Sequence, residues 1–581
     1  MIRLSYIGLF FVLCNFLFAQ NENQNVTTPK REVRAVWIAT VNSLDWPPSF
    51  DPIEQQNSLK EIVARLKAAN FNTIFFQVRS RADAMYNSRF EPWAQQLTGT
   101  LGGKPAWDPL SFIIDEAHAN GLEVHAWFNT FVAWTKKEMP PHTVPEHIVN
   151  KYPELVKPVN GEWWFDPGIP SARDYIVQVA LDLVRNYELD GIQFDFIRYP
   201  NKPIADDETF RRYNNGMKKD DWRRDNINKF VQAFHDSVIK FKPMLKIGAA
   251  PTGIYKNTNG IKGQQSYYEI FQDSRRWLKE GWMDYLAPQV YWTLGVTRGD
   301  PDYAMVAMDW ANNKYGKHVY VGIGAYKSDV FNEIPILIDT TRALGLEGNS
   351  FFRFENISKE LNVGNRYRNI AILPSMPWKD SIPPNPPKNV QVNNIVDGIF
   401  KIQWSQPEIA IDLDGAKRFC IYRSTVKDID AENPENLLAI VPGTILEFTD
   451  TIKHISSAKY FYAVSVLDKG NNESKPAVES IVIPEIVEIS KRFSFNFMLG
   501  QSYPNPASSF VFIPYEIKEQ TPVFLKILDS QNRELINVVD AVQEPGRYVA
   551  CADVSKLEDG FYTYLLVAGN FSERKIFKVD D

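Results

Sequence analysis

Hydrophobic residues in the first two thirds of the chain form short runs of strand length, and segments with helical periodicity separate these runs. Eight such strands with intervening helices predict a (β/α)8 TIM barrel over residues 31–375. An open, doubly wound sheet is the alternative, but no Gly-x-Gly-x-x-Gly follows the first strand. The predicted strands are 33–40, 72–79, 122–129, 189–196, 245–251, 284–292, 319–326 and 349–355.

The pattern changes after a proline-rich stretch, SIPPNPPKNV at 381–390, which has the character of a stiff linker. Short alternating strands separated by turn-rich spacers follow it, and they predict a β-sandwich over residues 384–485. A further all-β module is predicted over residues 490–581. The fold class is therefore α/β, with a TIM barrel followed by two all-β sandwich domains.

The amino terminus has the pattern of a secretory signal peptide over residues 1–20. Arg3 precedes an apolar run, and Ala19-Gln20 precedes a polar segment. Cys14 invites a lipoprotein interpretation, but the bulky Leu13 stands where a small residue is expected. No other segment is long and apolar enough to cross a membrane. We therefore expect a protein that is secreted, attached to the cell surface or periplasmic.

Charge and cysteine usage narrow the class of partner. The net charge of −6 over 581 residues gives no reason to expect nucleic acid or an anionic membrane surface. Only Cys420 and Cys551 remain after signal cleavage, and they make no disulfide framework. Neither Cys-x-x-Cys nor His-Glu-x-x-His occurs. The sequence therefore predicts no metal site and no cofactor.

In TIM-barrel enzymes the active site lies at the carboxyl ends of the strands, so the strand prediction gives a list of candidate site residues. Polar and aromatic residues end several strands together. Chance polar residues at strand exits are the bland alternative, but several strands sharing the feature favours a site. The candidates for substrate binding are Trp37, Gln77, Arg79, His125, Trp127, Asn129, Arg198, Tyr199, Gln289, Tyr291 and Trp292.

Asp195 is the strongest single candidate, because it interrupts the apolar run LDGIQFDFIRYP at 189–200. Burying an unpaired carboxylate costs several kcal/mol. Strand alternation directs Phe194 and Phe196 to the opposite face and Asp195 into the mouth of the barrel. The alternative is a salt bridge with Arg198 that only closes the loop. A functional role is favoured, since a buried ion pair is weak support for stability.

Glycoside hydrolysis uses two carboxylates, one that protonates the leaving oxygen and one that attacks or activates water. Asp195 suits the nucleophile or base. Glu355 is the geometric candidate for its catalytic partner, with Asp83, Asp45 and Asp166 behind it. An Asn such as Asn129 could instead orient an acetamido group that acts as an internal nucleophile.

Several of the other candidates have a structural interpretation of comparable weight. A lone strand histidine such as His125 is as often a hydrogen-bonded core group, and the Trp side chains either stack on sugars or fill the barrel. Arg79 and Arg81 suggest a carboxylate-bearing substrate, or they neutralise local Asp. Adjacent Trp163 and Trp164 in a loop suggest a cleft wall.

Long ordered stretches of residues 31–370 resemble the glycosyl-hydrolase-like family ten. The stretches are REVRAVWIATVNSLDWPP (31–48), FQVRSRADAMYNSRFEPWAQQLTG (76–99), DPLSFIIDEAHANGLEVHAWFN (108–129), DGIQFDFIRYP (190–200), KEGWMDYLAPQVYW (279–292) and GAY (324–326). The resemblance implies a TIM-barrel glycosidase, and some members cut peptidoglycan glycan strands that lack stem peptides. It implies that Asp195 is the central acidic residue. Many relatives place a second acidic residue where Phe196 stands here.

The C-terminal modules also carry resemblances. Residues 384–485 resemble a fibronectin type III domain through Trp404, Tyr422-Arg423, Tyr460 and Tyr462. Tyr503-Pro504-Asn505-Pro506 makes residues 490–581 similar to C-terminal sorting domains of type IX secretion, which implies contact with secretion machinery.

The sequence thus predicts a secreted glycoside hydrolase that acts on a bacterial envelope or extracellular polysaccharide, with peptide-free peptidoglycan strands among the candidate substrates. A non-catalytic carbohydrate-binding or scaffold protein on the same frame is the alternative, because fold alone does not decide function.

Overall fold

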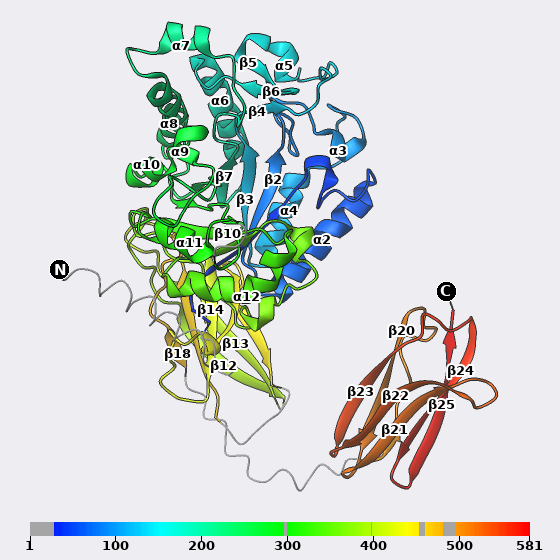
Figure 1. The fold of residues 1–581 in the computed structure, drawn as a ribbon. Coiled ribbons are helices and arrows are strands. Elements are labelled where there is room, and N and C mark those ends of the chain that lie inside the picture. Colours follow the sequence, from blue (N-terminus) through cyan, green and yellow to red (C-terminus); the bar gives the residue numbers. More distant parts are fainter. Residues whose placement is uncertain (1–27, 296–298, 397, 453–458, 480–495, 581) are drawn as a thin grey trace, which may run out of the picture. The chain divides into compact units, whose positions relative to one another are not determined.

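The computed structural model describes residues 28–295, 299–396, 398–452, 459–479 and 496–580 (Figure 1). The chain divides into two compact units, residues 1–481 and 482–581. The predicted signal peptide, with Cys14, lies outside the described residues. Within the described part, no helix combines the length and the apolar character that a bilayer span needs.

Eight parallel strands close into a barrel, which confirms the predicted fold class. Neighbouring strands pair in the order β1-β11-β10-β9-β8-β7-β3-β2. Every strand residue is buried, as expected when side chains fill the barrel inside and helices cover it outside. The strands are β1 (Val33–Ile38), β2 (Thr73–Arg79), β3 (Glu123–Asn129), β7 (Gly191–Asp195), β8 (Lys246–Ala249), β9 (Tyr285–Leu286), β10 (His318–Ile323) and β11 (Gly348–Phe351).

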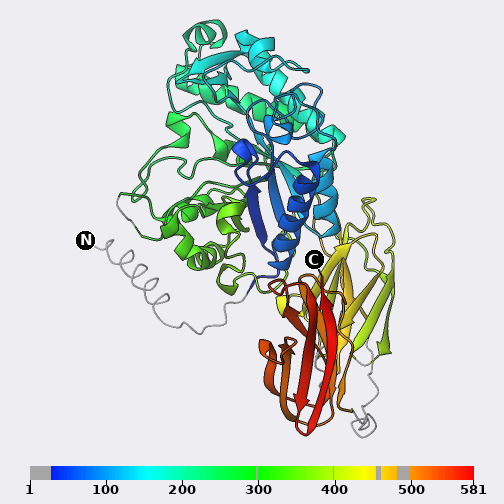
Figure 2. The same cartoon turned by 90° about the vertical axis from the view of Figure 1, so that its right-hand side faces the viewer.

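Helices surround the barrel strands (Figures 1 and 2). Two of them begin with a motif that can be read in the sequence, an Asp at the N-cap followed by Pro. Asp51 and Asp108 each accept backbone N–H groups of the first helical turn. The longer helices are α2 (Pro52–Ala68), α4 (Pro109–Ala119), α6 (Pro170–Asn186), α8 (Lys219–Val238), α11 (Tyr303–Ala311) and α12 (Ser328–Ala343).

The sixth and eighth barrel strands are shorter than predicted. β9 ends at Leu286, and Pro288, which has no N–H to donate, follows soon after. Gln289 lies beyond the strand and forms isolated bridges to Thr252 and Gly322. β11 ends at Phe351, and the chain enters the short helix α13 (Phe354–Ile357) instead of continuing as a strand. Apolar runs at the barrel rim therefore read longer than the strands they form.

A small antiparallel sheet is inserted after β3. Its strands are β4 (Val132–Trp134), β5 (Val156–Val159) and β6 (Glu162–Phe165), and β6 lies in the middle. Figure 1 shows this sheet beyond the carboxyl ends of β2 and β3. The insertion therefore adds side chains to the rim where the site is expected.

Sandwich strands follow the barrel, in one three-stranded and one four-stranded antiparallel sheet, ordered β12-β13-β16 and β15-β14-β17-β18. This part contacts the amino-terminal end of the barrel, where Lys417 Nζ lies 2.7 Å from Oδ1 of Asp190. The strands are β12 (Lys388–Val396), β13 (Ile399–Ser405), β14 (Arg418–Ser424), β15 (Leu437–Pro442), β16 (Glu447–Thr451), β17 (Phe461–Leu467) and β18 (Ala477–Glu479).

The second unit is also all-β. Its two antiparallel sheets are ordered β19-β20-β23 and β22-β21-β24-β25. The strands are β19 (Met498–Leu499), β20 (Phe510–Ile517), β21 (Thr521–Leu528), β22 (Glu534–Gln543), β23 (Gly546–Asp553), β24 (Gly560–Ala568) and β25 (Phe571–Val579).

Candidate active site

A cavity of about 560 Å³ opens at the carboxyl ends of the barrel strands. Residues at or just beyond the ends of all eight strands line it, so it occupies the place where this fold builds active sites. One residue from each strand end, taken in chain order, gives Ala39, Gln77, Asn129, Asp195, Ala250, Gln289, Tyr326 and Phe352.

Asp195 is the last residue of β7 and pairs in register with Asn129, the last residue of β3. Its side chain lines the cavity, and 9% of the residue is exposed. The backbone N–H of Phe196 donates a 2.7 Å hydrogen bond to its Oδ1. One carboxylate oxygen is thus fixed while the group stays accessible from the cavity.

Phe196 does not lie where strand alternation predicts. The strand ends at Asp195, and Phe196 has a left-handed backbone with φ of 48°. This turn brings Phe196 to the wall of the same cavity instead of the opposite face. Non-glycine residues with positive φ are uncommon and concentrate at functional sites.

Burial raises the pKa of Asp195 to about 6, against an ordinary value of 3.8. The Phe196 N–H, the Arg198 guanidinium and the Trp127 indole act in the opposite direction and favour the ionised form. The indole N–H of Trp127 makes no hydrogen bond of ordinary geometry to a described residue. Asp195 can therefore take up or release a proton near neutral pH.

Glu162 supplies the second carboxylate among the described residues that line the cavity, and the sequence did not single it out. It lies on β6, in the inserted sheet, and accepts a 2.9 Å hydrogen bond from Nε1 of Trp164. The sequence feature that could have pointed to Glu162 is its position directly before the Trp163-Trp164 pair, which suggested a cleft wall.

Arg198 lies close to both carboxylates. Burial lowers the pKa of its guanidinium, and the charges of Asp195 and Glu162 raise it. The guanidinium also sits over the rings of Phe196 and Trp164, 5.0 and 5.4 Å from their centroids. The ion pair with Asp195 considered from sequence is not formed among the described residues: Nη1 of Arg198 donates to Oδ1 of Asn201 at 2.6 Å, and the guanidinium is part of the cavity wall.

Four polar atoms of residues on the cavity wall have no hydrogen-bond partner among the described residues: Nε1 of Trp127, Oδ1 of Asn129, Oγ1 of Thr252 and Oδ1 of Asn356. Buried polar groups are nearly always paired, so orphans gathered in one cavity indicate a ligand that pairs them. The two amide oxygens accept, the indole N–H donates, and the Thr252 hydroxyl can do both. A polyhydroxylated ligand supplies both kinds of partner.

Seven of the predicted residues line this cavity. Gln77 is held by the N–H groups of Thr40 and Val41, which donate to its Oε1 at 2.9 and 2.8 Å. The seven are Gln77, Trp127, Asn129, Asp195, Arg198, Gln289 and Tyr291.

Trp37 and His125 are not among the lining residues and lie within the barrel. Nε1 of Trp37 donates to Oε1 of Gln193 at 2.6 Å, and Nδ1 of His125 lies 2.7 Å from the hydroxyl of Tyr285. Strand alternation correctly gives an inward face but says nothing of depth along the barrel axis. The two side chains fill the interior of the barrel and do not line the cavity.

Arg79 and Tyr199 also lie outside the lining of the cavity, and both have protein partners. Arg79 is fully buried and makes two 2.7 Å hydrogen bonds to the carboxylate of Glu91. Tyr199 is buried, and its hydroxyl accepts a hydrogen bond from Asn226. Both side chains stabilise the loops behind the cavity wall.

Trp292 and Glu355 also lie outside the lining of the cavity. Trp292 packs against the barrel core, and Glu355 is exposed on α13. Arg353, and not Glu355, lines the cavity after β11, and its guanidinium forms an ion pair with the carboxylate of Asp45. The prediction of Glu355 assumed a continuing strand, whereas the chain has already turned into a helix.

Sequence comparison supports the chemistry that the site suggests. The pattern of the family described as Glycosyl hydrolase-like 10 matches residues 32–336. Glycosyl hydrolase YngK of Bacillus subtilis (strain 168) is 31% identical over 480 residues, 77% of this chain and 92% of that protein. Glycosyl hydrolase DigH of Escherichia coli (strain K12) is 32% identical over 326 residues, 51% of this chain and 73% of that protein.

Among solved structures, the catalytic domain of a β-amylase from Paenibacillus polymyxa covers 57% of this chain and 94% of its own, with 12% identity and a TM-score of 0.38. At that score the likeness adds nothing to the barrel already described. The family pattern spans more than half of the chain, and YngK aligns over most of both proteins. The protein belongs to the family Glycosyl hydrolase-like 10.

Proposed function

We propose that the protein hydrolyses O-glycosidic bonds of a bacterial envelope or extracellular polysaccharide, with peptide-free peptidoglycan strands as the leading candidate. The observation that carries the proposal is the pair of carboxylates, Asp195 and Glu162, on the wall of one cavity at the mouth of the barrel. Two carboxylates are what glycosidic hydrolysis requires. Relatives named as glycosyl hydrolases support the same reaction class.

The raised pKa of Asp195 supports a division of roles between the two carboxylates. Asp195, with a pKa of about 6, is in part protonated near neutral pH and serves as the general acid that protonates the leaving oxygen. Glu162 then attacks the anomeric carbon or activates water from the other side. This reverses the role of nucleophile or base that the sequence alone favoured for Asp195.

The rest of the wall suits a sugar. The ring of Tyr291 stacks against Phe352 with 5.8 Å between centroids, which gives an extended aromatic surface beside the carboxylates. Trp127, Asn129 and Thr252 supply unpaired donors and acceptors. Oδ1 of Asn129 is an acceptor suited to a hydroxyl or to the N–H of an acetamido group.

We further propose that the chain is exported through the predicted signal peptide and that the final module addresses it to secretion machinery. The seven-stranded antiparallel arrangement of β12 to β18 supports the fibronectin type III resemblance.

The test compares peptidoglycan sacculi before and after amidase treatment, which removes the stem peptides. The full chain is expected to release new reducing ends from the stripped strands, and little from intact sacculi. Equal release from both would remove the peptide-free specificity. Binding to the strands without any release would replace the hydrolase by a carbohydrate-binding protein.

A further inference from the structure

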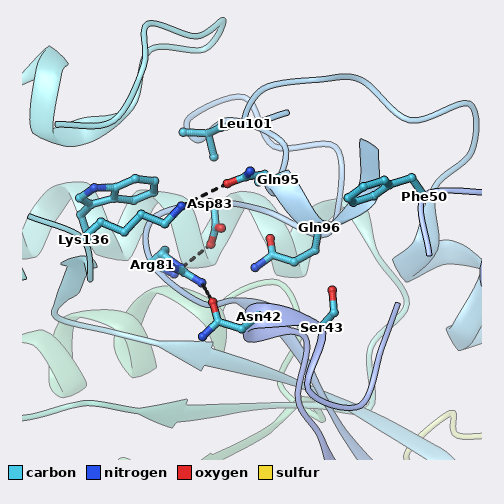
Figure 3. Close-up of a pocket in the computed structure, with 10 residues that line it drawn as sticks. Asn42, Ser43, Phe50, Arg81, Asp83, Gln95, Gln96, Leu101 and Lys136 are labelled. Carbon is cyan, nitrogen blue, oxygen red and sulfur yellow. Dashed lines mark hydrogen bonds between the residues drawn. The ribbon is translucent and has the colours of Figure 1, made fainter. Parts of the chain in front are cut away.

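A second, smaller pocket of about 290 Å³ lies beside the barrel cavity (Figure 3). The loops that follow β1 and β2 and the end of β4 form most of it. Figure 3 shows Arg81, Gln96 and Lys136 around the same space. None of the cavity-lining residues described above belongs to this pocket, so the proposed reaction does not account for it.

Arg81 is the central group of the pocket. It is 5% exposed and donates hydrogen bonds to Oδ1 of Asn42 at 2.7 Å and to Oγ1 of Thr135 at 3.0 Å. Its Nε is buried without a partner, and no carboxylate of the described residues forms an ion pair with it. Arg79, two residues earlier, is by contrast neutralised by Glu91. A buried guanidinium without a carboxylate is expected to bind an anion.

The other charged groups leave the pocket positive. Lys136 is exposed, and its Nζ has a 3.4 Å contact with Oε1 of Gln95. Asp83 is 2% exposed, and its Oδ1 accepts from Ser80 Oγ and from the backbone N–H groups of Ser80 and Arg81. The one carboxylate in the lining is therefore engaged by its own loop, while neither Arg81 nor Lys136 forms an ion pair with a carboxylate of the described residues.

The same pocket offers groups that a sugar ring uses. Oε1 of Gln96 is a buried acceptor with no partner among the described residues, and it can pair with a hydroxyl. Phe50, at the rim, is 61% exposed and presents an aromatic face. A small inorganic anion needs neither of these groups. The pocket therefore suits an anionic group carried on a sugar.

The pocket and the barrel cavity share a wall. Val41 and Ser80 line the cavity, while the next residues, Asn42 and Arg81, line the pocket. Thr135, which also lines the cavity, accepts a hydrogen bond from the Arg81 guanidinium. A polysaccharide bound across the carboxylates can pass over this wall and place a neighbouring unit in the pocket.

We propose that the pocket around Arg81 and Lys136 is a subsite for a carboxylate-bearing sugar unit of the same polysaccharide. The inference rests on the proposed glycan substrate and specifies its class as acidic. A planar guanidinium matches a carboxylate with two parallel hydrogen bonds. On peptidoglycan strands, removal of the stem peptide by amidase turns an amide into a free carboxylate, so this subsite selects the stripped strand.

The test measures binding by calorimetry on the full chain carrying Asp195→Asn, so that no cleavage intervenes. The probes are strands from amidase-treated peptidoglycan and the same strands with their carboxyl groups reduced to alcohols. The carboxylated strands are expected to bind about 10–100-fold more tightly, as for charge-assisted hydrogen bonds. Adding Arg81→Gln is expected to abolish that preference, and adding Lys136→Gln to weaken it.

Two further variants keep the result interpretable. Lys137→Gln removes the adjacent exposed charge, which does not line the pocket, and is expected to leave the preference intact. Arg81→Lys keeps the positive charge but loses the planar guanidinium, so a preference for the carboxylated strands between those of the parent and Arg81→Gln is expected. Its thermal unfolding should match that of the parent, which shows that the chain is folded. A preference that persists in Arg81→Gln, or equal binding of both probes, overturns the subsite.

The subsite and the proposed reaction fail separately. If the parent cleaves strands and Arg81→Gln leaves the carboxylate preference unchanged, the subsite is wrong and the hydrolase stands. If no strand is cleaved but binding still requires Arg81 and the carboxylate, the hydrolase is wrong and the acidic subsite stands.

Discussion

The backbone N–H of Phe196 donates a 2.7 Å hydrogen bond to Oδ1 of Asp195, the residue directly before it. The left-handed backbone of Phe196, with φ of 48°, turns the chain at this point and keeps both side chains on the cavity wall. A buried carboxylate with one oxygen fixed by the backbone and the other free suits proton transfer. The local turn therefore positions the group on which the proposed chemistry depends.

Asp195 is expected to reduce stability at neutral pH. Its folded pKa of about 6 lies above the ordinary 3.8, so the folded chain holds the proton more tightly, and stability falls as pH rises through this window. At about 1.4 kcal/mol per pKa unit, the cost approaches about 3 kcal/mol at pH 7. Asp195→Asn is thus expected to unfold at higher urea than the parent near neutral pH, with no advantage near pH 4.

Asp190 gives the matched control of opposite sign. Although burial alone raises it, the pKa of Asp190 lies well below its usual range because Lys417 and His118 favour the charged form. Asp190→Asn is therefore expected to lose stability near neutral pH. A loss of stability in Asp195→Asn as well would contradict the raised pKa.

Activity is expected to decline as pH rises through about 6, since the general acid must carry its proton. Arg198 lowers the pKa of Asp195, so Arg198→Gln raises that pKa and moves this limb to higher pH. The measurement is the pH at which kcat falls on the alkaline side of a kcat–pH profile. The absolute value of kcat is not used, because Arg198 also lines the cavity and its substitution changes kcat at every pH. If this fall in kcat occurs at the same pH in Arg198→Gln as in the parent, the titrating group is not Asp195.

Glu162 is expected to be as necessary as Asp195. Glu162→Gln removes the second carboxylate and is predicted to lower kcat by about 100- to 10,000-fold, the usual range for a positioned acid or base. Glu154→Gln, at an exposed position in the same insertion, is the matched control with unchanged kcat. If Glu162→Gln cleaves strands at the parent's rate, the second catalytic carboxylate is a residue other than Glu162.

Lys417 is one of several charged residues whose ion pairs join the barrel and the sandwich. Its Nζ lies 2.7 Å from Asp190, whose other oxygen faces Nε2 of His118 at 2.7 Å. Lys417→Met is expected to cost about 1–3 kcal/mol near pH 7, because it leaves a buried carboxylate with fewer partners. The cost should shrink as pH falls below the ordinary Asp value of 3.8 toward the lowered pKa of folded Asp190, where the carboxylate takes up a proton.

Urea unfolding at several pH values measures this effect. Lys475→Met, at an exposed position in the same sandwich, is the control with unchanged stability. A cost for Lys417→Met that is independent of pH would assign the effect to packing and not to the ion pair.

The sequence predicted the barrel because strand runs and helical periodicity repeat eight times, and it predicted Asp195 because a carboxylate in an apolar run has a large desolvation cost. It placed Trp37 and His125 on the inward face correctly but did not show that they lie outside the cavity lining, because alternation defines a face but not a depth. It missed Glu162 because that residue reaches the rim from an inserted sheet, outside the strand-end rule. Phe196 escaped prediction because its direction depends on one backbone angle.

The most direct test of the central claim compares the parent with Asp195→Asn on strands from amidase-treated peptidoglycan, scored by new reducing ends. Asp115→Asn, at an exposed position on α4, controls for the loss of an Asp. The account predicts a loss of rate of about 100- to 10,000-fold in Asp195→Asn with thermal stability equal or higher. Release at the parent's rate by Asp195→Asn would contradict it.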